Sequence, residues 1–253
     1  MPFNIFLLTF LAIFRVDSSD ATDTTETSAF AGHELTQELV VVSKLLATIS
    51  VSNCTVVDAK IPLEKTTSSL PPPSPSLHLK FVALGRGTQN YTCSSSDVTM
   101  TPVAVGAVAT LFDASCILKS NPELLHQLPA SFQTVPLNAM NFLAAVTGRI
   151  LFSTTDTIVL GEHYFNARGS PVFDLRLGGY PHWIGTKKVS SAVAPTKGND
   201  APWLKLEATD SSTTNGIQDI YRVHTSGGQA PATCNGQDKA FQVEYSAEYW
   251  FYG

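Results

Sequence analysis

The sequence predicts a mainly β protein, an antiparallel β-sandwich or barrel with one or two short helices. Segments rich in Val, Tyr, Phe and Thr are separated by clusters of Gly, Pro, Asn and Ser, the pattern of short strands joined by turns. Helical segments do not alternate regularly with these strands, so a parallel α/β sheet is not expected. Hydrophobic residues make up 43% and charged residues 15% of the 253 positions, which favours a packed extracellular domain over a disordered chain.

The first 20 residues predict a secretory signal peptide. An apolar run of about 12 residues, from Phe3 to Phe14, is followed by Arg15 and a polar stretch. This run is shorter than the roughly 20 residues that a membrane-spanning helix requires. No later segment is long and apolar enough to span a bilayer. We therefore expect a secreted, extracellular protein without a membrane span, with a short buried helix as the alternative interpretation of the apolar run.

Residues 21–76 are expected to form a variable N-terminal segment. Apolar residues at helical spacing predict a short helix within 33–49, with a strand over its Val-rich part as the alternative. The proline-rich stretch 66–76 is incompatible with a central strand or a helix, because proline lacks the backbone donor and has a fixed φ. It is expected to be an extended lead-in, either a linker or a segment laid over the edge of the domain.

The main β-domain is expected over residues 77–253. One interior helix is predicted at 121–128, where Asn121 is a suitable N-cap and Pro122 a suitable first residue. The other regular segments have the composition of strands. The predicted strands are 78–84, 88–93, 105–112, 149–154, 157–161, 171–175, 201–208, 217–225 and 240–252.

The glycine pair Gly85-Arg86-Gly87 raises the question of a phosphate-binding loop. A dinucleotide fold needs a third glycine and a following helix. Here the pair is followed by Thr88-Gln89-Asn90 and then by a strand or loop. The pair is better explained by positive φ angles or a bulge between two strands. No cofactor is expected.

Four cysteines lie beyond the signal peptide, and an even count in an oxidising compartment predicts two disulfides. Four cysteines allow three connectivities, which the sequence does not distinguish. Pairing within one apparent hairpin makes Cys93–Cys116 plus Cys54–Cys234 the preferred solution. Asn53 and Asn90 each begin an N-x-Thr glycosylation triplet, which adds support for secretion.

Six ordered segments carry a resemblance to a known family. They are LKFVALGRGTQNYTC, VGAVATLFDASC, GEHYFNARGSPVFDL, APWLKLEA, IYRVHTSGGQAPATC and EYSAEYWFY, between about Leu77 and Tyr252. Together they resemble the DUF3455 family, secreted proteins of filamentous fungi with shorter bacterial relatives and a largely unassigned function. The resemblance implies secretion and a common fold, and it implies no reaction. Some members carry a malate-dehydrogenase label, but this sequence lacks the nucleotide-binding fingerprint that such an activity needs.

The segment GEHYFNARGSPVFDL holds the candidate catalytic residues Glu162, His163 and Asp174. Across a hairpin, these ionisable groups are of the type that serves as a general base or a metal ligand. The spacing of His163 and Asp174 matches no known ligand signature, however. The favoured interpretation is a polar hairpin face with a half-buried, hydrogen-bonded His163, so no catalytic residue is assigned and no metal is expected.

Other catalytic patterns have less support. The chain has no G-x-S-x-G segment for an exposed nucleophile, and Ser226, shortly after His224, is better explained as part of a strand-ending loop. Glu244 and Glu248 are expected to share one strand face because their offset is even. Two acids on one sheet face are expected to be solvated. Glu207 and Asp210 are similarly unspecific.

Aromatic residues suggest a binding surface. Trp183, Trp203, Trp250 and Tyr252 are candidates for a flat platform that stacks on sugar rings. The stronger interpretation is that the tryptophans fill the core. In the last strand, Trp250 and Tyr252 share a face with Ser246 and Glu248, so they are half-exposed if that face is polar. An exposed aromatic patch would indicate a partner.

The sequence favours a secreted, disulfide-bonded, non-catalytic protein that binds a cell-wall polysaccharide or a host surface ligand, with host colonisation as its context. A hydrolase or lyase acting on polysaccharide, with Glu162, His163 and Asp174 as its site, is the first alternative. A structural extracellular protein is the second. The net charge of −5 argues against nucleic acid as a partner.

Overall fold

The computed structural model describes residues 54–63, 70–93, 99–142, 158–196, 198–209 and 214–253. The predicted signal peptide, the helix predicted within 33–49, the strand predicted at 149–154, Asn53 and Asp210 lie outside these residues. None of the helices in the described part of the chain has the length and apolar character needed to cross a bilayer.

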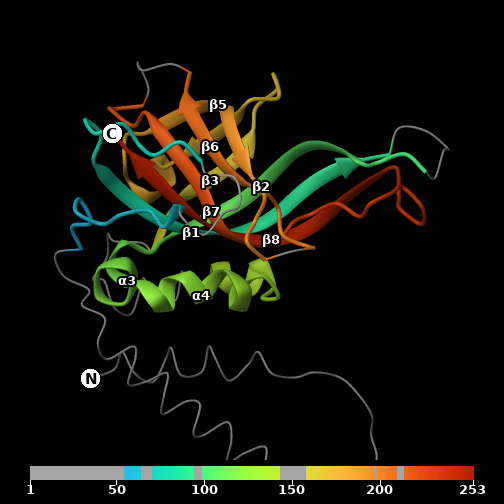
Figure 1. Ribbon diagram of the computed structural model, residues 1–253, viewed down its shortest axis with the longest axis horizontal. Coiled ribbons are helices and arrows are strands. Elements are labelled where there is room, and N and C mark those ends of the chain that lie inside the picture. The colour runs from blue at the N-terminus through green and yellow to red at the C-terminus, as the bar shows by residue number, and fades with distance from the viewer. Residues whose placement is uncertain (1–53, 64–69, 94–98, 143–157, 197, 210–213) are drawn as a thin grey trace, which may run out of the picture.

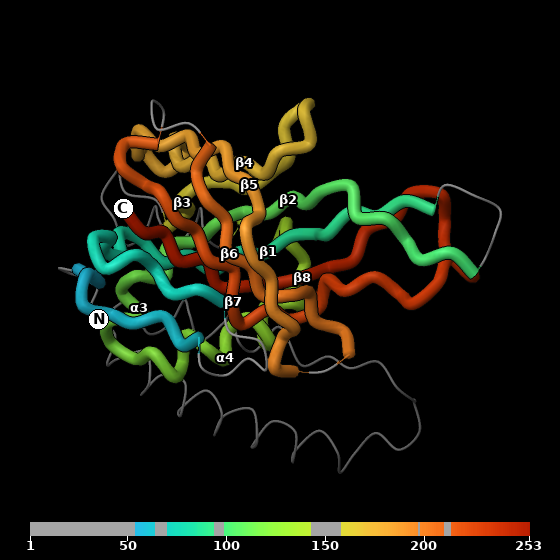
Figure 2. The backbone as a smooth tube through the Cα atoms, turned by 45° about the horizontal axis from the view of Figure 1, so that its top comes forward, coloured from blue at the N-terminus to red at the C-terminus, as the bar shows by residue number. Residues whose placement is uncertain are grey.

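Eight antiparallel strands form a closed barrel, which confirms the predicted fold class and selects the barrel over the sandwich. Each strand pairs with its neighbours in the chain, and the first strand closes the barrel against the last (Figure 1). The strands are β1 Leu79–Thr92, β2 Val103–Asp113, β3 Val159–Phe165, β4 Pro171–Asp174, β5 Trp183–Ala192, β6 Trp203–Ala208, β7 Asp219–Gly227 and β8 Ala240–Tyr252. Strands β1, β2 and β8 extend beyond the others as a long arm (Figures 1 and 2).

The glycine pair lies inside one continuous strand, β1, and the prediction of two strands separated by a bend was wrong. Gly85 and Gly87 pair in register with both β2 and β8, and neither has a positive φ. A methyl group at Gly87 would lie 1.8 Å from the carbonyl oxygen of Val108, and one at Gly85 would lie 2.5 Å from the ring of Tyr249. The glycines therefore permit close packing of backbone and ring in the barrel.

Strand β5 was not predicted. Its buried positions Ile184 to Thr186 are consecutive, and the exposed Lys187 to Val189 follow them, so the segment lacks the alternation that marks a strand. A shift of register against β6 between Lys188 and Ser190 accounts for the break in the pattern.

The predicted helix at 121–128 is present as α4, Pro122–Phe132, and is longer than expected. The side chain of Asn121 accepts a hydrogen bond from the backbone N–H of Leu124 at 3.0 Å, as an N-cap should. Two further elements were not predicted, the helix α3 Ser115–Ser120 and a 3-10 turn at Arg176–Gly178.

Strands β1, β7 and β8 are buried on both sides. Their inner face contributes residues such as Tyr249 and Phe251 to a core within the barrel. Their outer face contributes Val82, Val223 and Trp250 to a second core, which is completed by α3, α4 and described residues before β1. Figures 1 and 2 show α3 and α4 running along this outside face. In the proline-rich lead-in, Leu70 is buried in the outer core, and the carbonyl of Pro71 accepts a hydrogen bond from the Tyr221 hydroxyl at 2.9 Å.

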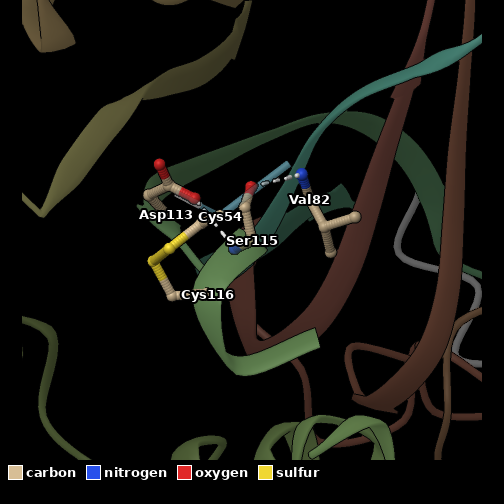
Figure 3. Close-up of a disulfide and its surroundings, with 5 residues drawn as sticks. All are labelled: Cys54, Val82, Asp113, Ser115 and Cys116. Carbon is tan, nitrogen blue, oxygen red and sulfur yellow. Dashed lines mark hydrogen bonds between the residues drawn. A yellow bond between two sulfur atoms is a disulfide. The ribbon is translucent and has the colours of Figure 1, made fainter. Parts of the chain in front are cut away.

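The two disulfides are Cys54–Cys116 and Cys93–Cys234, so the preferred pairing was wrong. Cys93 and Cys116 lie at opposite ends of the β1–β2 hairpin, whose 11-residue β2 strand spans about 35 Å. Cys93 instead lies beside the start of β8, where its N–H donates to the Lys239 carbonyl at 2.9 Å. Figure 3 shows Cys116 bonded to Cys54 at the start of α3, beside the hydrogen bond from Val82 N–H to the Ser115 hydroxyl.

Candidate functional site

One part of the barrel interior is an open cavity of about 510 Å³. Its walls combine aromatic and aliphatic side chains with a few polar groups, as is typical of small-molecule sites. The apolar walls include Tyr91, Phe165, Phe173, Leu204 and Leu206, and the polar groups include Gln89, His163, Thr186, Lys188 and Arg222. An eight-stranded barrel is wide enough to hold one small ligand among its interior side chains.

Arg222 is the buried cation of this cavity, whose lining also includes Lys187 and Lys188. Its inward position in β7 leaves the residue only 6% exposed. One guanidinium nitrogen, Nη2, donates to the carbonyl of Pro202 at 2.9 Å, but the buried Nε has no hydrogen-bond partner. No carboxylate of the described residues forms an ion pair with Arg222. A buried cation is costly unless it is paired, so this guanidinium is suited to bind an anion that enters the cavity.

Hydrogen-bond donors surround the guanidinium. The hydroxyls of Tyr245 and Tyr249 lie 2.8 Å apart and share a hydrogen bond. Burial raises the pKa of both phenols, although the charge of Arg222 acts against this rise, so both hydroxyls stay protonated at neutral pH. The side-chain amide nitrogen of Gln89 is buried without a partner. The cavity thus offers the guanidinium Nε and the Gln89 amide as donors to an acceptor group.

His163 contributes a neutral ring to the same wall. Its Nδ1–H donates to the Val172 carbonyl at 2.8 Å, and the ring stacks on Phe173 with centroids 4.3 Å apart. Burial lowers the pKa of His163 to about 4, the hydrogen bond to Val172 partly opposes this, and the charge of Arg222 lowers it further. His163 therefore adds no charge to this wall at neutral pH.

Replacing His163 with glutamine is expected to flatten the acid side of the stability profile. The pKa of folded His163, about 4, lies below the ordinary value of 6.5, so the unfolded chain binds the extra proton between these pH values. The stabilisation is present above pH 6.5 and is lost as the pH falls toward 4, a change of about 3 kcal/mol. Urea unfolding at pH 4.5, 5.5, 6.5 and 7.5 measures the free energy of unfolding of both proteins. The prediction is contradicted if this free energy depends on pH equally in wild type and in His163→Gln.

The structure separates the three predicted catalytic residues. Glu162 and Asp174 are directly opposed on neighbouring strands, whereas His163, the residue after Glu162, points to the other side of β3 and into the cavity. Asp174 accepts two hydrogen bonds from the guanidinium of Arg176, at 2.8 and 2.6 Å, and one from its backbone N–H at 3.1 Å, and these lower the pKa of Asp174. The three side chains therefore do not converge.

The predicted aromatic platform is largely buried. Trp203, Trp250 and Tyr252 are at most 5% exposed, so Trp203 and Trp250 fill the core, as the stronger interpretation held, and the condition for a half-exposed Trp250 and Tyr252 is not met. The outer core covers this face of β8. Trp183 is half-buried, and its Nε1–H donates to the hydroxyl of Tyr164 at 3.1 Å. These four residues do not form one flat surface.

The remaining candidates have structural surroundings of their own. Asn90 is half-buried in β1, where its side chain accepts a hydrogen bond from Thr88 at 3.1 Å, and its glycosylation stays a prediction. Glu207 on β6 forms an ion pair with Lys187 on β5, with 3.9 Å between Oε2 and Nζ. Glu244 forms an ion pair with the buried Arg86. The Nε–H of Arg86 also donates a hydrogen bond to the carbonyl of Val135 at 2.9 Å.

Sequence reasoning missed Arg222. A signal was present, because Arg222 is the one charged residue within Ile220-Tyr221-Arg222-Val223, a stretch otherwise apolar on both faces. In a strand that is buried on both sides, such a residue has to be buried as well, and a buried arginine requires a partner.

Comparison with known proteins gives one finding. No curated protein and no solved structure matches this chain. A family model described as "Protein of unknown function (DUF3455)" matches residues 73–253, more than two thirds of the chain. This confirms the resemblance noted in the sequence, and the chain belongs to the DUF3455 family.

Proposed function

We propose that this protein is an extracellular binding protein that takes a small organic anion into its barrel. The observation that carries the proposal is the buried guanidinium of Arg222, which faces a cavity of about 510 Å³ and has no carboxylate partner among the described residues. A ligand that brings its own carboxylate would supply the missing partner.

The surroundings of Arg222 favour a ligand with one acidic end and an apolar body. The acidic end would accept hydrogen bonds from the guanidinium Nε and from the amide of Gln89, both of which lack partners. Hydrogen bonds between charged groups are the stronger ones in proteins. The body would contact rings such as Tyr91, Phe165 and Phe173. Aromatic or medium-chain carboxylic acids have this shape.

The two disulfides support an extracellular setting, since such bonds persist in oxidising compartments. A role at a cell wall or host surface, including host colonisation, would then depend on capture of a small acidic molecule there. Stacking on polysaccharide has less support, because Trp203 and Trp250 are buried. The polysaccharide hydrolase or lyase also has less support, because His163 lies apart from Glu162 and Asp174. A purely structural protein would bind no acid at all.

Replacing Arg222 with methionine is expected to weaken carboxylate binding at least 10-fold, because a hydrogen bond to a charged group contributes about 1.5–3 kcal/mol. The probe is the fluorescent anion 8-anilinonaphthalene-1-sulfonate, displaced by benzoate, cinnamate, indole-3-acetate and octanoate. The neutral amides of the same acids are expected to compete poorly with wild type. Folding should persist, since methionine removes an incompletely paired buried charge and retains much of the volume.

Arg176→Met is the matched control, because Arg176 is a surface arginine whose side chain is 61% exposed and lies on the outer face beside Asp174. It is expected to bind the acids as wild type does. The proposal fails if acids and amides compete equally, or if Arg222→Met retains wild-type affinity for the acids.

A further inference from the structure

Three side chains from distant parts of the chain meet between α4 and the outer face of the barrel. His126 projects from α4, His224 from β7 and Glu248 from β8, and together they form what we call the His–Glu cluster. The Nδ1 atoms of His126 and His224 lie 2.9 and 2.8 Å from the same carboxylate oxygen, Oε1 of Glu248. The centroids of the two imidazole rings are 4.2 Å apart. One nitrogen from each ring and one oxygen therefore converge on a single point.

The backbone of β7 is distorted to place His224 there. Arg222 points into the cavity, so regular alternation would direct His224 inward as well. The register against β8 shifts between Val223 and Ser226, and His224 has a φ of 44°, in the left-handed region. This conformation is costly for a residue with a side chain and is concentrated at functional positions. The bulge turns His224 to the outer face, next to Val223.

A second layer of contacts orients the carboxylate. Glu248 is fully buried, and its other oxygen, Oε2, accepts a hydrogen bond from the indole N–H of Trp250 at 2.9 Å. Oε1 is thereby directed at the two histidines. The edge of Trp203 packs against His224 with centroids 5.0 Å apart and an interplanar angle of 80°. Outer hydrogen bonds that orient ligands in this way are characteristic of metal sites.

The hydrogen bonds within the cluster converge on one atom. Oε1 of Glu248 is the partner of the Nδ1 atoms of both rings. Two imidazole nitrogens and one carboxylate oxygen form the donor set that zinc and other first-row divalent metals prefer. The side chain of His126 is 20% exposed, against 11% for His224, so solvent reaches the cluster from the helix side.

We propose that the His–Glu cluster binds a divalent first-row transition metal, with zinc as its occupant and His126, His224 and Glu248 as its protein ligands. Water from the His126 side completes a four-coordinate site. The metal ties α4 to the barrel wall, on the face of β7 opposite the Arg222 cavity. This metal site is independent of the proposed binding of an organic acid in the cavity. The expectation that no metal is bound is thereby revised, because the three ligands come together only when the barrel closes.

The test is a calorimetric titration of the untagged, full-length protein with zinc chloride, together with the same titration of His126→Asn. Wild type is expected to bind one zinc per chain and to melt at a higher temperature with zinc than without it. His126→Asn is expected to bind at least about 100-fold more weakly, since loss of even an outer partner of a ligand costs 10- to 100-fold. His126 is half-buried on a helix, so this variant should fold.

The control is His182→Asn, which alters a half-buried histidine outside the cluster whose Nδ1 lies 2.7 Å from the Thr214 carbonyl. It should bind zinc as wild type does. A second measurement uses the unmodified protein with cobalt(II), whose visible absorption should report a four-coordinate site and should disappear when zinc is added. Absence of zinc binding, equal binding by His126→Asn, or a cobalt spectrum of the hexahydrated ion would each overturn the proposal.

Discussion

Replacing Cys93 and Cys234 together with alanine is expected to lower the free energy of unfolding by about 5 kcal/mol. The bond closes a loop with a sequence separation of 141 residues, so its removal returns a large conformational entropy to the unfolded chain. This is comparable to the whole stability of many domains. Both cysteines are at most 7% exposed, and alanine leaves no unpaired hydroxyl in their place. Urea unfolding under non-reducing conditions measures the loss.

The comparison variant removes Cys54–Cys116, whose sequence separation is 62 residues. Chain entropy predicts a smaller loss there, about 4 kcal/mol. If the shorter loop proves the more stabilising one, or if the Cys93–Cys234 variant unfolds like wild type, loop closure is not the source of stability.

Replacing Gly87 with alanine is expected to destabilise the barrel by at least about 3 kcal/mol. The added methyl group would lie 1.8 Å from the Val108 carbonyl oxygen and 2.6 Å from the Cα of Ala109. These are backbone atoms of the paired strand β2, so no side-chain rotation relieves the clash. Thermal and urea unfolding measure the loss of stability. If the loss exceeds the stability of the barrel, no folded protein is recovered on expression.

Gly169→Ala is the contrasting control. Gly169 has a φ of 73°, but a methyl group there would meet no atom within 4 Å. Only the left-handed backbone opposes alanine, at a cost of about 1 kcal/mol. A loss at Gly87 no greater than the loss at Gly169 would show that β1 and β2 can separate without penalty.

The glycine pair illustrates what could be predicted of the fold and what could not. The absence of a third glycine and of a following helix correctly excluded a nucleotide loop. Gly85 and Gly87 were nevertheless assigned to a bend, because glycine is equally suited to a turn and to a crowded strand. The crowding comes from Val108 and Tyr249, which are 21 or more residues away in the chain. Local sequence carries no information about such contacts.

The face of β8 that carries Trp250 could not be assigned for a related reason. Alternation correctly divides β8 into two sets of residues, but it does not show whether both sets are covered. The outer face is buried because α4 and residues such as Leu70 cover it. The position of helix α4 was predictable from Asn121 and Pro122, whereas its packing partner was not.

The candidate sites depend still more on long-range contacts. His163 was expected to be hydrogen-bonded and half-buried on a polar hairpin face. The hydrogen bond is present, but the residue is buried, and its inward direction separates it from Glu162. Glu248 was expected on a solvated face, and it is fully buried beside His126 and His224. These three residues have no common spacing, so only the closure of the barrel and the docking of α4 bring them together.

The pairing of β1 with β8 also determines when this protein can fold during its synthesis. Strand β1 leaves the ribosome about 150 residues ahead of β8, which at 5–20 residues per second is a delay on the order of 10 s. Throughout this time one edge of β1, with Val82 and Leu84, lacks its partner strand and is open to pairing with other chains. Cys93 likewise cannot form its disulfide until Cys234 has been synthesised. A nascent chain of this kind depends on protection of its first strand until its last one arrives.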